Sequence, residues 1–360
     1  MIRYWDISVL EAARLRIAKV FDEFENIFVS VSSGKDSTVL YHLCLEEAQK
    51  RGRKIKLFFL DQEAEYEGTV QIMREMMKHP LVEPYWFQVP IRMTNATSYD
   101  QPFLYAWGPG EEWLRPKEEI AIKEIKEDYP KRFYDFFDWF EQQQTEKTAF
   151  FIGLRSKESM NRFRAVTKNP GYDGIPWSTK TKNEKCFRFY PIYDWTFGDI
   201  WKYIADNEIP YNPVYDKMYC LKGKSVNGIR ISNLIHEKSF ACLSELQEIE
   251  PETYEKLCNR LKGIHAAAKY ARESMMYQAE ELPGAFQSWK DYRDYLIESS
   301  PMEEAHRERL KKRFSKQPEV DSIHRQQCRQ VLLCDYENNL PVNTQAMKKE
   351  ELRAKWWNVL

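Results

Sequence analysis

The sequence predicts an α/β fold that is built on a doubly wound, mostly parallel sheet. A short apolar run at 27–31 leads into a helical pattern, a second apolar run follows at 55–60, and Asp61 comes directly after it. Strands that alternate with helices in this way form right-handed parallel βαβ units. The carboxyl ends of such strands share one edge of the sheet, where ligands bind. Asp61 is therefore expected at the ligand-binding edge.

The first half of the predicted sheet follows a regular order. An amphipathic helix over 7–24 precedes the first strand, and the helix after that strand ends at 51–53. A helix over 67–78 and a third strand over 82–89 come next. This region supplies three parallel strands with helices between them.

The second half resumes with a buried strand at 148–152 and an extended segment at 187–192. A helix over 194–204 follows. Thr196 is its expected N-cap, with Asp199 in the capping-box position three residues later.

The sequence divides into an α/β region, an insertion within that region, and a C-terminal helical region. Residues 1–217 carry the α/β pattern, which residues 91–147 interrupt as a helical, aromatic insertion that is too long for an ordinary loop. We expect the aromatic stripe of the insertion to be core rather than a stacking platform. Residues 218–360 form a charged helical region with little glycine. Its basic run at 306–316 is expected to be a solvated helix face, with nucleic-acid binding as the weaker alternative.

Composition sets limits on the class of protein. The 360 residues are 43% hydrophobic and carry a net charge of −1, so no global field indicates a nucleic-acid or membrane protein. Seven cysteines, an odd number without a C-x-x-C pair, do not form a disulfide framework pattern. The sequence shows no signal-peptide run and no apolar stretch of membrane-spanning length. We expect a soluble, cytoplasmic protein.

The turn after the first strand is the strongest candidate for chemistry. Residues 32–37 read S-S-G-K-D-S and open a helix, so exposed amides lie next to one lysine and form an anion site. A Walker A loop is excluded, because Val29 stands where its first glycine would be and Asp36 follows Lys35. Phosphate is the expected ligand, and a tight turn without a ligand is the alternative.

A second polar segment follows the strand at 148–152. Gly153, Arg155, Arg162 and Arg164 lie within twelve residues of each other, and guanidinium groups suit an anionic ligand. Because this strand and the first one are expected to be parallel, Arg155 and Arg162 should lie in the same cleft as Lys35.

Three blocks now stand in order: S-S-G-K-D-S at 32–37, G-L-R-S-K-E-S-x-x-R at 153–162, and P-I-Y-D-W-T-F-x-D-I-W-x-Y-I at 191–204 followed by I-P-Y-N-P-V-Y-D. Over roughly residues 25–217 they resemble the phosphoadenosine phosphosulfate (PAPS) reductase family of PP-loop proteins. These belong to the Rossmann-like adenine nucleotide alpha-hydrolase superfamily. Ser33 stands where a second glycine is common. The insertion and the C-terminal third resemble the immunoglobulin-binding-regulator A branch, and that resemblance implies a ParB-like protein partner.

The resemblance implies roles for individual residues. The loop would hold the phosphates of ATP through Ser32, Ser33, Gly34, Lys35, Asp36 and Ser37, and the second block would bind phosphate or sulfate through Gly153, Arg155 and Arg162. Asp61 would lie near the nucleotide and bind Mg²⁺. The implied catalytic residues are Lys35, Asp36, Asp61 and Arg155. In the third block Asp194, Trp195 and Asp199 suit a structural role as well as a catalytic one.

One departure bears on the reaction. The reductases of this family need a nucleophilic cysteine in a pattern like E-C-G-x-H, whereas the last cysteine here, Cys334, lies in L-L-C-D-Y. The cysteine pairs that bind an iron–sulfur cluster are missing too. We therefore expect an enzyme that cleaves ATP to AMP and pyrophosphate and adenylates an unknown acceptor, acting with a partner protein. The alternatives are a PAPS reductase and a nucleotide-binding regulatory scaffold for a ParB-like DNA-binding partner.

Overall fold

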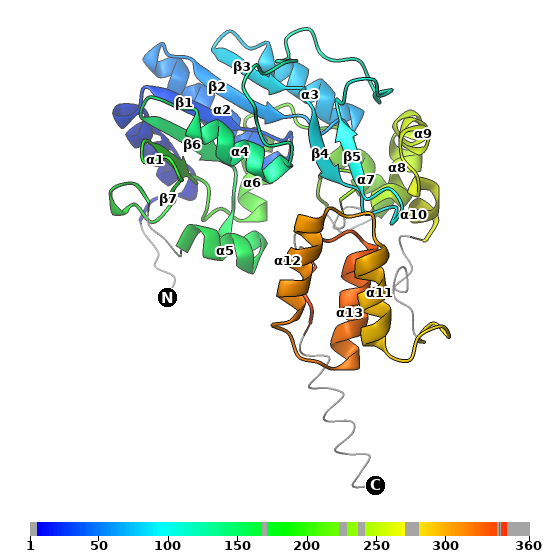
Figure 1. Cartoon of the computed structure of the whole chain (residues 1–360). Coiled ribbons are helices and arrows are strands. Elements are labelled where there is room, and N and C mark those ends of the chain that lie inside the picture. The colour runs from blue at the N-terminus through cyan, green and yellow to red at the C-terminus, as the bar shows by residue number, and fades with distance from the viewer. Residues whose placement is uncertain are drawn as a thin grey trace. The chain divides into compact units, whose positions relative to one another are not determined.

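The computed structural model describes residues 6–167, 171–222, 229–236, 242–270, 281–336, 338 and 340–343. The chain forms two compact units, which are coloured by residue number in Figure 1. The first contains Met1–Ile91 and Ala106–Ser232, and the second contains Arg92–Tyr105 and Asn233–Leu360.

A six-stranded sheet forms the centre of the first unit, in the order β3-β2-β1-β6-β8-β7. The strands are β1 (Asn26–Ser30), β2 (Ile55–Leu60), β3 (Val82–Phe87), β6 (Thr148–Ile152), β7 (Ser178–Lys180) and β8 (Cys186–Phe189). All neighbouring pairs are parallel except β7 with β8, which is the edge pair. The predicted doubly wound, mostly parallel sheet is confirmed.

The strand order reverses between β1 and β6. The chain runs outward from β1 to β3 and then returns to place β6 on the other side of β1, with Ser30 opposite Ile152. Loops that leave two such strands diverge to opposite faces of the sheet and leave a crevice at its carboxyl edge. The two segments that the sequence analysis selected, 32–37 and 153–162, follow these two strands.

Helices cover both faces of the sheet (Figure 1). Side chains of Val29 and Phe151 on one face share a hydrophobic core with α1, α2, α3 and α6. The helices of this unit are α1 (Val9–Glu23), α2 (Lys35–Arg51), α3 (Glu67–Met77), α4 (Phe133–Gln142), α5 (Met160–Thr167), α6 (Phe197–Asp206) and α7 (Val214–Lys222). Two 3₁₀ turns, Ser156–Glu158 and Tyr172–Gly174, complete it.

The opposite face carries the aromatic helix of the insertion. Phe140 of α4 is buried, and its ring lies 5.2 Å from Phe28, 4.9 Å from Phe58 and 5.4 Å from Phe87 between centroids. This confirms that the aromatic stripe is core. The insertion is less helical than expected: within 91–147, α4 is joined by the two-stranded sheet of β4 (Ile91–Thr94) and β5 (Phe103–Ala106), and much of the remainder is turn or coil.

In the described part of the second unit, the elements other than β4 and β5 are helices. Its helices are α8 (Leu243–Ile249), α9 (Pro251–Arg260), α10 (Ile264–Tyr270), α11 (Trp289–Ser299), α12 (Glu304–Phe314) and α13 (Asp321–Leu332). Leu296, Phe314 and Val331 meet in its core. In α12, Leu310 is buried while Lys311 and Lys312 are exposed, as expected of a solvated basic face. Across the described parts of the chain, no helix has the length and apolar character needed to cross a membrane.

Candidate nucleotide site at the carboxyl edge of the sheet

The loop at 32–37 joins β1 to α2. Its N-cap is Gly34, which has no side chain with which to cap the first-turn amides of α2. Helix N-termini with uncapped amides bind anions. Ser37 fixes the loop instead, because its hydroxyl donates to the Gly34 carbonyl at 2.9 Å and accepts from the Ser32 amide at 3.2 Å.

Ser33 has a φ of 53°, in the left-handed region that favours glycine. This explains why a glycine is common at this position in loops of this type. A hydrogen bond at 3.0 Å from Asn212 Nδ2 to Ser33 Oγ holds the buried serine in this conformation. The same amide donates to Thr69 Oγ1 at 3.0 Å, so Asn212 joins the loop to α3.

Lys35 is the first residue of α2 and is only 5% exposed. A cation at this end of a helix opposes the helix dipole, so the position disfavours lysine unless an anion is bound. Its Nζ lies 3.2 Å from Asp36 Oδ2 and 5.6 Å from the centre of the Phe197 ring. Burial lowers the pKa of Lys35, although the neighbouring Asp36 opposes that change.

Gly153 brings the segment after β6 against the start of α2. A Cβ atom at this position would lie 2.9 Å from both the backbone nitrogen and the Cα of Ser37, so only glycine allows this approach. Two residues later, buried Arg155 donates a hydrogen bond from Nε to Asp36 Oδ1. The structure thus places Gly153 and Arg155 at the loop, as the parallel strands required.

Arg162, on α5, is partly exposed and donates to Glu158, which is also an ion-pair partner of Arg155 at 3.7 Å. Burial and then the nearby Arg230 lower the pKa of Arg162. Arg230 is thus near enough to act on Arg162, while the carboxylates of Glu158 and Asp36 offset part of the positive charge. Arg230 is a residue that the sequence analysis missed, because nothing in the pattern around it points to the loop.

Residues of the third block, 191–216, form hydrogen bonds that hold the loop in place. The Lys35 amide donates to the Tyr215 hydroxyl at 3.0 Å, and the Tyr215 ring also lies beneath Lys35 Nζ. Tyr215 and Asn212 both lie in I-P-Y-N-P-V-Y-D, the end of the third block, to which the sequence analysis assigned no role in the loop. Their polar groups would have been the available signal.

The other residues of that block have structural contacts. Asp194 accepts two hydrogen bonds from Arg16, at 2.8 and 2.7 Å, and Trp195 donates to the Val9 carbonyl at 3.1 Å. Asp199 and Thr196 form the predicted capping box. These contacts fasten α6 and the preceding turn to the rest of the unit.

Asp61 follows β2 at the same edge of the sheet and is fully buried. Arg115 Nη2 donates to both of its carboxylate oxygens, at 2.6 and 2.7 Å. The side chains of Trp86 and Gln88 and the amide of Glu63 donate to it as well, at 2.8, 2.9 and 2.9 Å. A carboxylate that accepts from so many N–H groups does not fit a magnesium ligand.

Among the described residues, no other side chains take the place of Asp61 as the centre of a metal site. Asp36, the second carboxylate that the sequence analysis placed in the site, is paired with Lys35 and Arg155. Within the described ranges, no three His, Cys, Asp or Glu side chains group in a way that could hold a metal ion.

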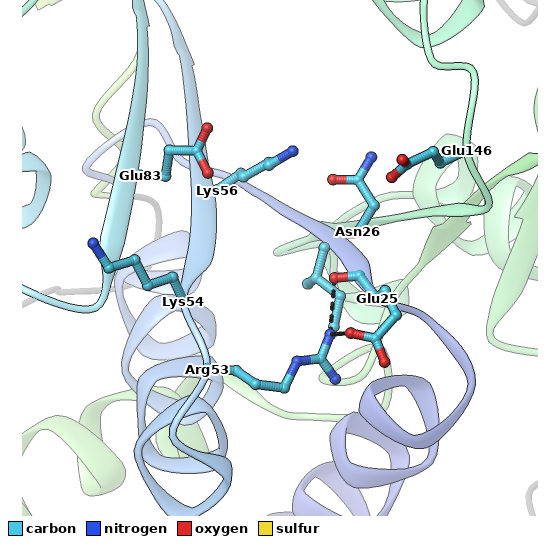
Figure 2. A pocket seen from close by; sticks show the side chains of 8 residues that line it. Glu25, Asn26, Arg53, Lys54, Lys56, Glu83 and Glu146 are labelled. Atoms are coloured by element: carbon cyan, nitrogen blue, oxygen red, sulfur yellow. Dashed lines mark hydrogen bonds and ion pairs between the residues drawn. The ribbon is translucent and has the colours of Figure 1, made fainter.

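A polar pocket of about 280 Å³ lies at the opposite edge of the sheet (Figure 2). Its lining includes Asn26, Lys56 and Glu83, which stand at or near the amino ends of β1, β2 and β3. Figure 2 shows Arg53 directed at Glu25, where it donates to the backbone carbonyl at 2.8 Å. The amino ends of parallel strands do not form the ligand crevice of such a sheet, so this pocket is separate from the candidate site.

The two cysteines nearest the C-terminus do not have the properties of nucleophiles. All seven are free thiols, and Cys328 and Cys334, the two nearest the C-terminus, are both buried. Burial raises the pKa of Cys328 to about 12, whereas a reactive thiol needs a lowered pKa.

Comparison with known proteins agrees with the predicted family. The profile of the phosphoadenosine phosphosulfate reductase domain matches residues 26–227, and a domain of unknown function (DUF3440) matches residues 223–322. The uncharacterized protein YbdN of Escherichia coli (strain K12) is 31% identical over 321 residues, which cover 85% of this chain and 78% of that protein.

Two of the more distant relatives are enzymes by name. An adenosine 5′-phosphosulfate reductase of Oceanobacillus iheyensis is 24% identical over 54% of this chain and 68% of its own length. Sulfate adenylyltransferase subunit 2 of Maricaulis maris is 25% identical over 58% of this chain and 66% of its own. A solved structure of Candida glabrata FMN adenylyltransferase with FAD and pyrophosphate has 16% identity and a TM-score of 0.37, over 60% of this chain and 64% of its own. With more than half of its residues matched by the profile, the chain belongs to the phosphoadenosine phosphosulfate reductase domain family.

Proposed function

We propose that this protein binds ATP at the loop 32–37 and cleaves it between the α- and β-phosphates, transferring AMP to an acceptor that carries a nucleophilic oxygen. The observation that carries the proposal is the convergence of two cationic groups, Lys35 and Arg155, on Asp36 at the switch point between β1 and β6. With Arg162 and Arg230 nearby, this edge suits a ligand with several negative charges.

The chemistry needs charge stabilisation more than covalent help. An acceptor oxygen would form a bond to the α-phosphorus while the bond from that phosphorus to the bridging oxygen breaks and pyrophosphate leaves. The Lys35 side chain and the first-turn amides of α2 that follow the Lys35 amide, which donates to Tyr215, would stabilise the charge that develops on pyrophosphate. Arg155 would hold the phosphate chain in line. Since Asp61 does not fit a metal ligand, no step is assigned to Mg²⁺.

Among the relatives, sulfate adenylyltransferase subunit 2 is by its name one subunit of an adenylyl-transferring enzyme. This supports the expectation that the present chain transfers AMP and acts with a partner protein. It favours an enzyme subunit as the partner over a ParB-like DNA-binding protein.

The alternative function, sulfonucleotide reduction, has less support than adenylyl transfer, because it requires a reactive cysteine. A thiolate must attack the sulfonyl group in that reaction, and the buried Cys328 with its raised pKa is a poor source of one. The relative named as a reductase and the one named as an adenylyltransferase subunit are similar to this chain at nearly equal identity, 24% and 25%, so similarity does not choose between the two reactions.

The test is to incubate the protein with ATP labelled at the α-phosphorus, alone and with a cell extract that supplies acceptors. We expect label in AMP or in an adenylylated product, and unlabelled pyrophosphate. Label in ADP would contradict the proposal, because it reports cleavage at the γ-phosphate. Tight ATP binding without turnover under either condition would instead favour a regulatory scaffold.

A further inference from the structure

Arg115 holds the position beside Asp61 that a cation would take. Its Nη2 lies at nearly equal distances, 2.6 and 2.7 Å, from the two carboxylate oxygens. The Arg115 side chain is 9% exposed and the Asp61 side chain is completely buried, so little water reaches the pair. A buried carboxylate needs such a compensating charge.

The segment that delivers Arg115, residues 107–118, is fastened around this pair, and we call it the strap. Trp107 Nε1 donates to the Asp61 carbonyl at 2.9 Å, and the amides of Trp107 and Leu114 donate to the Glu63 carboxylate at 2.9 and 3.2 Å. At its far end, Glu118 accepts from Arg74 at 2.7 Å. The strap therefore fixes the guanidinium from both sides.

The backbone on both sides of this contact is strained. Glu63 has a φ of 64° and Trp107 a φ of 56°, and neither is glycine. Left-handed backbone at non-glycine residues costs free energy, and it persists where the surrounding contacts impose it. Here those contacts are the ones that bring Arg115 to Asp61.

We propose that Arg115 is a built-in replacement for a divalent cation at the β2 edge. It compensates the Asp61 charge permanently, so that this edge is complete without a metal. The inference concerns the edge on which the proposed ATP site lies, but it does not depend on ATP being the ligand.

The guanidinium also retains capacity to bind a ligand, as a metal with open coordination positions would. Arg115 Nε and Nη1 are buried and have no hydrogen-bond partner among the described groups, while the Trp107 ring covers the guanidinium at 4.9 Å. Buried donors without acceptors are rare in folded proteins. An oxygen of a bound ligand would satisfy them.

The experiment uses Mn²⁺ as the probe, on the full chain and without nucleotide. Electron paramagnetic resonance measures free Mn²⁺ in the presence of the wild type, and thermal unfolding is recorded with Mn²⁺ or EDTA for Arg115→Ala and for the double variant Asp61→Asn/Arg115→Ala. Arg132→Ala is the matched control, because Arg132 also lies in the insertion and pairs with a carboxylate, Asp135, at 3.0 Å.

We expect that the wild type does not bind Mn²⁺, and that Mn²⁺ does not change the unfolding temperature of the wild type or of Arg132→Ala. Arg115→Ala should unfold at a lower temperature than the wild type and regain about 2–4 °C when Mn²⁺ occupies the vacated position. The double variant should show no such gain. If Arg115→Ala does not fold, Arg115→Lys keeps a cation and should remain insensitive to Mn²⁺, and the wild-type measurement still stands.

Two results would overturn the inference. One is binding of Mn²⁺ by the wild type that Asp61→Asn abolishes, which would make Asp61 a metal ligand despite Arg115. The other is a folded Arg115→Ala that shows no response to Mn²⁺. Neither result bears on whether the loop 32–37 binds ATP.

Discussion

Arg155 donates a hydrogen bond from Nε to the carboxylate of Asp36, a residue 119 positions earlier in the chain. Asp36 also pairs with Lys35, so one carboxylate holds two cations at the start of α2. The carboxylate keeps the two cations together in the absence of a ligand. An incoming phosphate chain would then meet them already in position, without the cost of bringing like charges together.

Replacement of Lys35 by alanine should weaken ATP binding far more than it weakens the fold. Loss of a charged hydrogen bond costs about 1.5–3 kcal/mol, which is at least about tenfold in affinity. Asp36 remains paired with Arg155 in the variant, so no buried charge is left alone. Calorimetric titration with ATP and a thermal unfolding curve provide the two measurements. Lys202→Ala, on the exposed side of α6, is the control, and an unchanged affinity in Lys35→Ala would show that the lysine does not contact phosphate.

Gly153→Ala should damage both stability and ATP binding. The added Cβ would lie 2.9 Å from backbone atoms of Ser37, so β6 or α2 must shift, at a cost of about 1–3 kcal/mol. Urea unfolding and ATP titration measure the two effects. Gly198→Ala is a matched control, because the nearest atom to its new Cβ is Thr196 Oγ1 at 3.7 Å and alanine favours a helix. Equal stability of the two variants would contradict the close approach at Gly153.

Glu65 should make the wild type lose stability as the pH rises. Burial, reinforced by the nearby Asp61, raises the pKa of Glu65 to about 8, from 4.5 in an unfolded chain. The folded state then binds more protons than the unfolded state between these values, so the free energy of unfolding falls from about pH 5 to pH 8. Glu65→Gln should remove this contribution, which urea unfolding at several pH values would measure. The exposed Glu119→Gln should keep the wild-type slope, and an equal slope in Glu65→Gln would rule out a raised pKa.

Replacement of Cys328 and Cys334 together by serine should leave the formation of AMP and pyrophosphate essentially intact. Adenylyl transfer needs no thiolate, whereas sulfonucleotide reduction fails without one, by a factor on the order of 10⁶ for a deleted nucleophile. The assay supplies ATP or PAPS to both proteins and quantifies AMP, pyrophosphate and sulfite. Because both thiols are buried, thermal unfolding must first show that the variant is folded. If the wild type produced sulfite and the variant did not, the hypothesis of adenylyl transfer would be overturned.

Features that depend on residues close together in the chain could be predicted from the sequence. The strand β2 begins and ends at the predicted residues 55 and 60, because a short apolar run between a charged turn and Asp61 can only be a buried strand here. The capping box of Thr196 and Asp199 lies within four consecutive residues and was visible as a local pattern. Parallel βαβ connections then placed the ends of β1 and β6 at one edge, and with them Lys35 and Arg155.

The groups that surround those residues depend on how distant segments of the chain fold together. Tyr215 meets Lys35 across 180 positions, Asn212 meets Ser33 across 179, and Arg115 meets Asp61 across 54. Such pairs cannot be recognised from residue spacing in the sequence, because the pattern around each residue reflects only the helix, strand or turn in which it lies. The charge of Asp61 was visible in the sequence, and so was that of Arg115. Their pairing, which turned an expected metal ligand into half of a buried ion pair, required the strap to fold back over β2.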